Sequence, residues 1–455
     1  MNQLSFDVVI IGGGPAGSVA AIASARSGAS TLLVEQGAYL GGMLTRAGTG
    51  PQMSYHAGKL QVVTGIPEEI VCRMKENAFS PGHMEDFVGY TSSVTPFDPE
   101  GLKIILESMV CESGAQILYH TVFTGCEVRD GSIRSVRLFS KNGFFDVTAK
   151  VFLDCSADAD LATDAGVGSV YGRESDHLAQ PMTMNVRVSH VDREKVITYV
   201  KENCWDMLQT IPFDRLELIP RTGIQGAYSV MKKAREDGEL HVPRHQVLCF
   251  ECNNEGEFIL NMSRVSMLSA LDPFDLTKAE MEGRKQAFEI VAFMKRHIPG
   301  FENCRIISTG PNIGVRESRK INGKYKLTGL DLVKNTMFPD AIAMGGYPVD
   351  IHTPDSDYCT DGALFLKDGS WYSIPYRSLV TDEIDNLIVA GRCISATHEA
   401  CAAVRVTPIV MAIGQAAGTA AAQSVSTGEK ANSLNTDRLR DTLKAAGVFL
   451  EEYSE

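Results

Sequence analysis

The sequence lacks the features that direct a protein to a membrane or to nucleic acid. It has no run of basic residues and a formal net charge of -13, so attraction to nucleic acid or to an anionic bilayer is disfavoured. No apolar run is long enough to span a bilayer, because the alanine-rich stretch 409–422 is short and interrupted by glycine and glutamine. The first strand-like run starts within a few residues of Met1, which leaves no room for a secretory leader. We therefore expect a cytoplasmic protein with no nucleic-acid or membrane partner.

A dense cysteine framework is also missing. The 11 cysteines are scattered over 455 residues, which favours reduced thiols. One pair, Cys249 and Cys252, has the C-x-x-C spacing of a redox or zinc site, but its flanks resemble strand, where residues three apart point to opposite faces. No His/Cys cluster lies close by to complete a tetrahedral zinc site. We expect no metal site and interpret the pair as structural.

The N-terminal segment carries the elements of a dinucleotide-binding βαβ unit. Apolar runs at 6–11 and 31–34 predict two buried parallel strands. Between them lie the glycine-rich turn 12–17 and an Ala/Ser-rich helix that ends near Ser27. Glu35 follows the second strand directly, at the position where a carboxylate accepts the hydroxyls of an adenosine ribose.

Each glycine of the turn has a physical role in holding a diphosphate. Gly12 allows the tight turn, Gly14 lets backbone amides approach the diphosphate, and Gly17 permits close packing of helix on strand. The helix N-terminus at Pro15-Ala16 adds unpaired N–H groups and partial positive charge. Glu35 favours a free ribose 2′-hydroxyl, so the pattern predicts FAD or NAD rather than NADP and leaves the choice between FAD and NAD open.

Further segments resemble flavoproteins of the glutathione-reductase structural class. They are Gly41-Gly42-Met43-Leu44-Thr45, Asp154-Cys155-Ser156-Ala157-Asp158-Ala159-Asp160 and the strand from Asn386 into Gly391-Arg392. Other segments are similar to a largely uncharacterised family of bacterial FAD-dependent oxidoreductases, distantly related to fumarate reductase flavoproteins. These are Gly314-Val315-Arg316-Glu317-Ser318-Arg319, Ile374-Pro375-Tyr376-Arg377, Gly391 to Ala400 with Ser395 and His398, and Arg405 to Gly418. The resemblance covers nearly the whole chain and implies FAD as the cofactor.

The resemblance also implies which residues contact FAD beyond the N-terminal unit. They are Gly42, Met43, Ser156, Asp158, Gly391, Arg392 and Thr407. The helix that starts near Thr407 would direct its positive end toward the flavin ring. The chain departs from the wider class at Arg392, where relatives often place an acid for the ribityl chain, and at Ser156-Ala157, where they often have Thr-Gly.

The order of elements predicts an α/β fold: a Rossmann-like FAD-binding domain, with a parallel βαβ sheet and an antiparallel β-meander, plus an inserted α+β substrate or cap domain. Turn signals at Asp130-Gly131 and Asn142-Gly143 separate the runs of the meander, and the chain re-enters the parent sheet at 150–154. The expected segments are the FAD-binding domain at 1–175 and 371–430, the inserted domain at 176–370 and a helical tail at 431–455. A return of residues 300–330 to the FAD-binding domain is left open.

The predicted function is a FAD-dependent oxidoreductase that moves a hydride or its equivalent between the flavin and a small polar substrate, carboxylate-bearing compounds included. A second glycine motif for NADPH is missing, because Gly166-x-Gly168 lacks a flanking strand, helix and acid. We therefore expect a directly bound small-molecule substrate, with the electron donor or acceptor and the oligomeric state left open.

Candidate catalytic residues come from the segments similar to the oxidoreductase family. His398 is predicted as the acid or base, and Arg405 and Arg316 as binders of a substrate carboxylate or of the reduced flavin anion. Weaker candidates on the inserted segment are Asn261, Arg264 and His352. Two alternatives stay open: a flavin-binding sensor or assembly subunit without turnover, and a dithiol oxidoreductase that uses Cys249 and Cys252.

Overall fold

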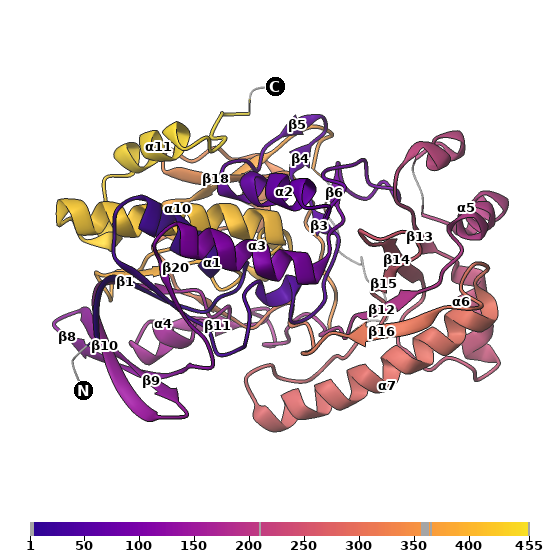
Figure 1. Ribbon diagram of the computed structural model, residues 1–455, viewed down its shortest axis with the longest axis horizontal. Helices are drawn as coiled ribbons and strands as arrows, with labels where there is room; N and C mark the ends of the chain where they lie inside the picture. The colour runs from indigo at the N-terminus through magenta and orange to yellow at the C-terminus, as the bar shows by residue number, and fades with distance from the viewer. Residues whose placement is uncertain (1–3, 209–210, 356–363, 365, 454–455) are drawn as a thin grey trace.

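The computed structural model describes residues 4–208, 211–355, 364 and 366–453. A seven-stranded sheet forms the centre of the larger part of the molecule, in the order β7-β2-β1-β10-β9-β8, with β20 also paired to β10 (Figure 1). Its parallel strands are β1 (Leu4–Ile11), β2 (Thr31–Val34), β7 (Gln116–Leu118), β10 (Gly143–Asp154) and β20 (Leu387–Val389). The predicted parallel βαβ sheet is therefore present, and β2 has the predicted bounds.

Strand β10 belongs to two arrangements at once. Its first half pairs antiparallel with β9 (Ser132–Ser140), which pairs in turn with β8 (Val122–Arg129) to form the predicted meander. Its last residues, 152–154, pair parallel with β20. The third run of the meander and the strand that returns to the parent sheet are thus one continuous strand, which ends beside the N-terminal glycine turn.

Two helices lie against each other on one face of this sheet, α1 (Pro15–Arg26) and α10 (Thr407–Thr427) (Figure 1). A Cβ added to Gly414 would lie 2.3 Å from the Ala16 carbonyl oxygen, and one added to Gly418 would lie 2.2 Å from that of Ala20. The two glycines, four residues apart on one helix face, therefore permit a backbone approach that any side chain would block. This contact places the start of α10 close to the start of α1.

A second sheet lies to the right in Figure 1, in the antiparallel order β13-β14-β15-β12-β16. Its strands are β12 (Val186–Ser189), β13 (Gly223–Gly226), β14 (Val247–Glu251), β15 (Phe258–Leu260) and β16 (Arg305–Thr309), with helices α5 (Arg193–Glu202), α6 (Tyr228–Glu236) and α7 (Pro273–His297). Helix α7 has a local explanation: Asp272 caps it by accepting from the amides of Phe274 and Asp275, and Pro273 occupies its first turn. We call residues 182–313 the cap region.

The remaining elements are short and mostly join the larger part. They are β3 (Gln52–Met53), β4 (His56–Ala57), β5 (Leu60–Gln61), β6 (Val94–Thr95), β11 (Ser169–Tyr171), β17 (Arg319–Ile321), β18 (Ala341–Gly345), β19 (Tyr372–Pro375), α2 (Ile66–Glu76), α3 (Pro99–Glu112), α4 (Asp160–Asp164), α8 (Gly329–Val333), α9 (His398–Val404) and α11 (Thr436–Ala445). The 3₁₀ turns are Gly42–Leu44, Cys204–Asp206, Phe213–Leu218, Tyr376–Ser378 and Ala431–Ser433.

Two main hydrophobic clusters mark the two parts of the molecule. Buried residues of the cap region, from Met182 to Ile313, form one of them together with Phe87 and Val88. Leu327, Ile342 and Tyr372 lie instead in the cluster that covers the main sheet. The segment after the cap region therefore returns to the larger part well before residue 371, while the exact domain boundaries stay a prediction.

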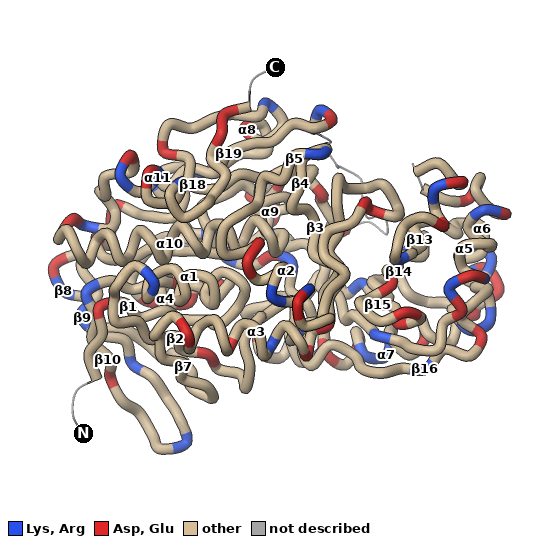
Figure 2. Tube along the Cα trace, turned by 45° about the horizontal axis from the view of Figure 1, so that its top comes forward, with Lys and Arg blue, Asp and Glu red and all other residues tan. Residues whose placement is uncertain are grey.

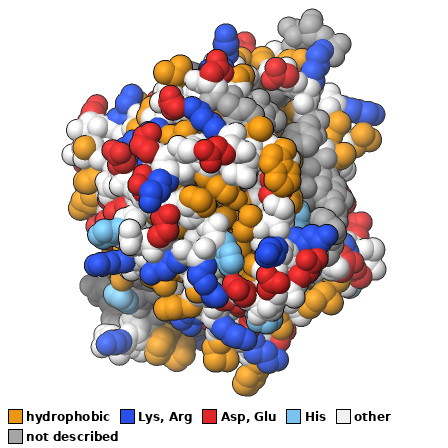
Figure 3. Space-filling view, turned by 90° about the vertical axis from the view of Figure 1, so that its right-hand side faces the viewer, with side chains coloured by type: hydrophobic (Ala, Val, Ile, Leu, Met, Phe, Trp, Pro, Cys, Tyr) orange, Lys and Arg blue, Asp and Glu red, His pale blue; other side chains and the backbone are white. Residues whose placement is uncertain are grey.

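Charge is spread over both parts. Lys/Arg and Asp/Glu residues are interspersed over the described trace (Figure 2), and the face at the cap-region end shows both signs among scattered hydrophobic side chains (Figure 3). That face presents mixed charge rather than a field of one sign. No single helix in the described ranges has the length and apolarity needed to cross a membrane, although α9 and α10 together, bent by 91° at their junction, meet that test by length and composition.

Candidate active site

One cavity, with a volume of about 210 Å³, lies where the main sheet faces the cap region. Segments far apart in the sequence supply its walls. From the larger part come Gly14, Pro15, Ala16, Met43, Gly391, Arg392 and Thr407, and from the cap region come Thr183, Gln225, Arg244, Leu248 and Asn261. The cavity therefore joins the predicted cofactor residues to cap-region residues, and of these five Asn261 alone was a candidate from the sequence.

The glycine turn at this cavity has the geometry that a diphosphate needs. A Cβ on Gly12, whose φ is +104°, would lie 2.4 Å from the Cys155 carbonyl oxygen, and one on Gly17 would lie 1.8 Å from that of Gly12. A Cβ on Gly14 would meet no atom within 4 Å, so the space beside its backbone is open. No side chain caps α1, so the first-turn amides keep donors for an anion.

Glu35 lies at the end of β2 beside this turn, as predicted. Its Oε2 accepts from the Gly13 amide at 2.8 Å, and its Oε1 accepts from the Gly37 amide at 2.6 Å and from Arg46 Nη1 at 3.1 Å. An ionised carboxylate has about four acceptor positions, so about one remains for a sugar hydroxyl. The turn and the acid together fit an adenosine diphosphate moiety.

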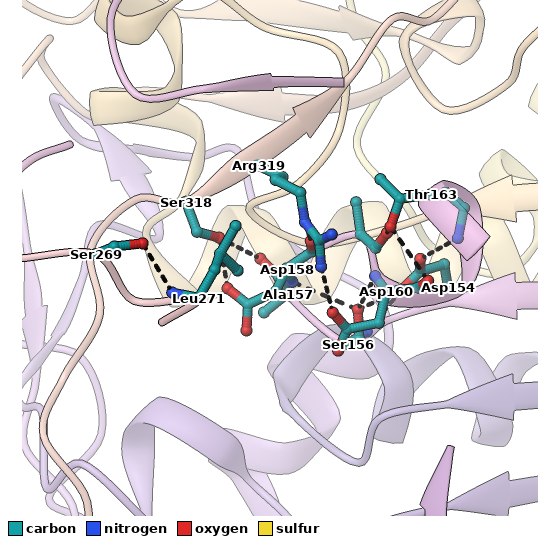
Figure 4. A network of polar contacts seen from close by, with 12 residues as sticks. Asp154, Ser156, Ala157, Asp158, Asp160, Thr163, Ser269, Leu271, Ser318 and Arg319 are labelled. Atoms are coloured by element: carbon teal, nitrogen blue, oxygen red, sulfur yellow. Dashed lines mark hydrogen bonds and ion pairs between the residues drawn. The ribbon is translucent and has the colours of Figure 1, made fainter. Parts of the chain in front are cut away.

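Some predicted cofactor residues support the loops rather than line the cavity. Ser156 Oγ donates to Asp154 at 2.6 Å, and Asp158 accepts from Arg392 Nη2 at 2.5 Å. Figure 4 shows the network around Asp154, Ser156 and Asp158, in which Arg319 Nε donates to the Asp158 carbonyl oxygen at 2.7 Å. Gly42 lies against the glycine turn, since a Cβ on it would be 2.9 Å from Gly14 Cα. Residues next to the Asp154–Asp158 network in the chain, such as Cys155 and Ala157, line the cavity.

Two predicted arginines meet in the cavity, although they are far apart in the sequence. Arg316 is buried, and its Nη1 donates to the Pro181 carbonyl oxygen at 2.7 Å and to Thr183 Oγ1 at 2.5 Å. Arg405 Nη2 donates to Gln180 Oε1 at 3.3 Å, and its buried Nε has no hydrogen-bond partner among the described residues. Both guanidinium groups line the cavity and can bind an anion there.

The charge around these arginines is strongly positive. Burial and the neighbouring charges of Arg405, Arg244 and Arg264 lower the pKa of Arg316 to about 9. Among the cavity-lining residues that the structure describes, Asp350 is the one acidic side chain. Like charges gathered with little compensation in a cavity indicate a site for an anionic ligand.

A histidine–aspartate pair lies in the same cavity. His352 Nε2 is 3.1 Å from Asp350 Oδ2, and Asp350 also accepts from the hydroxyls of Tyr90 at 3.0 Å and Tyr347 at 3.2 Å. Burial and the charge of Arg316 hold the pKa of His352 below its ordinary value, so the imidazole is neutral. Because the carboxylate accepts the Nε2 proton, Nδ1 carries the lone pair, and this buried atom has no hydrogen-bond partner in the described part of the chain.

His398, the predicted acid or base, lies elsewhere. It begins α9, and its Nδ1 is 2.7 Å from Glu317 Oε2, while Glu317 also pairs with Lys320. Together with Lys320 it lines a separate small pocket and is not among the residues around the main cavity. The structure therefore brings Arg316 and Arg405 together but gives His398 no access to a substrate in that cavity.

Sequence reasoning gave His352 little weight and missed its partners. The two-residue spacing of Asp350 and His352 in an extended segment is a usable signal, because such residues lie on one side of the chain. Tyr90 and Arg244 carry no comparable signal, since each is a lone residue in a loop whose position depends on distant contacts.

The C-x-x-C pair is buried, and neither thiol lines the main cavity. Cys249 lies in β14 and Cys252 follows it, with no disulfide between them. Burial raises the pKa of both thiols to about 12, so neither is a thiolate near neutral pH. We predict that replacing both with alanine leaves the rate of flavin reduction by substrate unchanged in stopped-flow measurements. A loss of reduction with FAD content and melting temperature preserved would restore the dithiol alternative.

Comparisons with known proteins support the cofactor prediction. The family described as FAD dependent oxidoreductase matches residues 7–443 of the chain. A soluble pyridine nucleotide transhydrogenase of Mycobacterium bovis is 52% identical over 61 residues, 13% of each protein. A digeranylgeranylglycerophospholipid reductase of Methanoculleus marisnigri is 27% identical over 173 residues, 36% of this chain and 42% of that protein. The chain thus matches less than half the length of these relatives.

Solved structures resemble the chain over nearly its whole length. The flavin-dependent brominase Bmp2 aligns with a TM-score of 0.52 and 14% identity, over 96% of this chain and 83% of that one. The p-nitrophenol 4-monooxygenase PnpA of Pseudomonas putida aligns with a TM-score of 0.51 and 9% identity, over 99% and 91%. At these identities the likeness concerns the fold alone.

Proposed function

This chain belongs to the FAD-dependent oxidoreductase family, with FAD as its cofactor, and on that premise we propose that it transfers a hydride or its equivalent between FAD and a small anionic substrate. The observation that carries the proposal is the joining of the glycine turn with Arg316, Arg405 and His352 in one cavity. Neither alternative from the sequence is favoured: the family supports an enzyme, and the buried thiols of Cys249 and Cys252 lie outside the cavity lining.

Two helix starts and the glycine turn form the proposed FAD site. The amides of the first turn of α1 bind the diphosphate, and Glu35 accepts from the ribose. Met43, Gly391 and Thr407 line the continuation of the cavity from that turn. The start of α10 also has no side-chain cap, so its amides and partial positive charge stabilise negative charge beside it.

The chain's own residues bind the substrate and move a proton. When bound, FAD supplies the two-electron acceptor or donor for a hydride equivalent. Arg316 and Arg405 hold an acidic group of the substrate through charge-assisted hydrogen bonds. In the oxidative direction, the substrate loses a hydride from carbon and a proton from the adjacent atom, and His352 Nδ1 receives that proton. Asp350 fixes the ring and stabilises the imidazolium that results, and the reductive direction reverses each transfer.

The test is a search for turnover with FAD-loaded protein. We expect yellow protein whose bound FAD is bleached without oxygen by at least one of a panel of small carboxylates, or whose dithionite-reduced FAD is reoxidised by one. We predict that Arg316→Gln raises the KM for that carboxylate about 10- to 100-fold, through the loss of a charge-assisted hydrogen bond. The control is Arg284→Gln, because Arg284 lies on α7 with 47% of its side chain exposed.

Two results would contradict the proposal. Protein that carries no flavin and cannot be reconstituted with FAD would refute the cofactor site. An Arg316→Gln enzyme that keeps the wild-type KM would show that this arginine does not hold the substrate.

A further inference from the structure

Arg244 is a buried cation that has no counter-charge among the residues the structure describes. It lies in the loop between α6 and β14, and 1% of it is exposed. Its Nε and Nη2 have no hydrogen-bond partner, and no ion pair to it occurs among the described residues. A guanidinium group presents five donors, and burying it unpaired is costly. Such a group at a cavity wall therefore points to an anionic partner that enters the cavity.

Arg244 lies at the cavity wall, in the loop that leads into β14. Residues at spacing two along a strand share a face, and Leu248 and Phe250 of β14 both line the cavity, as does Gln246 just before the strand. Arg244, two residues before Gln246 in the same loop, lines the cavity as well. The Gln246 side chain is itself held in place, since its Oε1 accepts from the Tyr228 hydroxyl at 2.8 Å. The wall that carries Arg244 thus combines a cation, polar amides and apolar surface, which is the usual composition of a small-molecule binding site.

Arg244 lines the same cavity as Arg316 and Arg405. Arg316 Nη2 is 3.5 Å from Asn261 Oδ1, and the Asn261 amide donates to the Leu248 carbonyl oxygen at 2.9 Å. Arg244 precedes Leu248 by four residues, a span of at most about 14 Å even when fully extended. The cap region therefore brings Arg244 within reach of a small molecule that Arg316 holds.

The charge balance of the cavity gives the class of ligand. Arg244, Arg316 and Arg405 each carry a positive charge, whereas the charge of Arg392 is compensated by Asp158 at 2.5 Å. Asp350 removes one positive charge, and His352 is neutral. Among the described lining residues, two positive charges therefore remain without compensation, and a dianion matches this balance better than a monoanion.

We propose that Arg244 is a specificity-determining residue and that the substrate is a dianion, with its second negative charge recognised by Arg244. This inference rests on the proposed function and adds the class of substrate. Two kinds of compound share this chemistry, a dicarboxylate and a phosphate monoester. The polar amides of Gln225 and Gln246 beside Arg244 can accept or donate hydrogen bonds to either.

Binding measurements on FAD-loaded protein test the proposal. The probes are succinate and glutarate as dicarboxylates, glycerol 3-phosphate as a phosphate monoester, and butyrate as a monocarboxylate. Affinity is measured from the change in the flavin absorption spectrum and by calorimetry. We expect at least one dianion to bind more tightly than butyrate, and Arg244→Gln to weaken that dianion about 10- to 100-fold while it changes butyrate affinity less than about threefold. Whether succinate and glutarate or glycerol 3-phosphate responds identifies the kind of dianion.

The controls separate this proposal from the general function. Arg284→Gln should leave every affinity unchanged, and FAD content and melting temperature report whether Arg244→Gln still folds. Arg244→Met provides a second folded variant if the amide is poorly tolerated. Equal binding of dianions and butyrate by protein that retains FAD, or an Arg244→Gln variant with wild-type dianion affinity, would overturn the assignment while the oxidoreductase proposal stands. Failure of the wild-type protein to bind FAD would overturn both.

Discussion

Replacing His352 with alanine is expected to lower kcat about 100- to 10,000-fold, the range that a positioned general acid or base contributes. The reason is the geometry of its two ring nitrogens. Nε2 is held by Asp350 at 3.1 Å, and the buried Nδ1 is left without a partner in the described residues. Removing the ring therefore removes the proposed proton acceptor while Arg316 and Arg405 still bind the substrate, so KM should change much less than kcat.

The measurement is the rate of flavin reduction or reoxidation by stopped flow. His241→Ala is the matched control, because this cap-region histidine has 77% of its side chain exposed and pairs only with Glu289 in the described part of the chain. His398→Ala decides between the two histidines: if it abolishes proton transfer while His352→Ala does not, the predicted role of His398 is correct and ours is wrong.

The pH dependence of the wild-type enzyme provides a separate check on His352. A base acts in its neutral form, so kcat/KM in the oxidative direction falls when pH drops through its pKa. Burial and the Arg316 charge lower that pKa, so the imidazole stays neutral at pH values where an ordinary histidine, with a pKa of about 6.5, is protonated. We expect the acid limb of the profile to lie below that value. An acid limb at or above it would contradict the assignment.

Replacing Gly17 with alanine is expected to abolish FAD retention during purification. The added Cβ would lie 1.8 Å from the Gly12 carbonyl oxygen, a backbone atom that cannot move without opening the turn. Forced overpacking of this kind costs about 1–3 kcal/mol or more, which weakens FAD binding by about 10- to 100-fold or more if the turn opens to relieve it. The readouts are the ratio of absorbance at the flavin and protein bands and a titration of apoprotein with FAD.

Two other glycines separate a folding effect from a cofactor effect. Gly14 has φ of -68°, and a Cβ there would meet no atom within 4 Å, so Gly14→Ala should keep the wild-type melting temperature yet bind FAD less tightly. Gly125→Ala, in β8, should change neither property, since its Cβ would be 3.6 Å from Asp164 Oδ2, an ordinary contact. Full FAD occupancy in both Gly17→Ala and Gly14→Ala would show that the diphosphate binds elsewhere.

The side chains that line the cavity lie mostly in loops, and sequence patterns did not predict which way these side chains point. Arg392 was predicted at the flavin, and it does line the cavity, but its guanidinium group is bound to Asp158 and to the Ala157 carbonyl oxygen. His398 lies in a segment similar to other flavoproteins, yet it faces Glu317. In neither case does the local sequence predict the direction of the side chain, because that direction depends on contacts with residues more than 70 positions away along the chain.

The sequence by itself determined the backbone of the proposed cofactor site. Strand, turn, helix and acid are successive in the chain, and their geometry depends on local rules: a buried Val/Ile run, a positive φ at Gly12 and a helix start at Pro15. Only the tertiary structure decided the proposed substrate site. Arg244 lies in a cap-region loop, His352 in an extended segment and Arg405 at a helix junction. They line one cavity because the cap region, with its own hydrophobic cluster, packs beside the main sheet. Long-range packing has no periodic signature in sequence, so the side chains it brings together are visible only in the folded molecule.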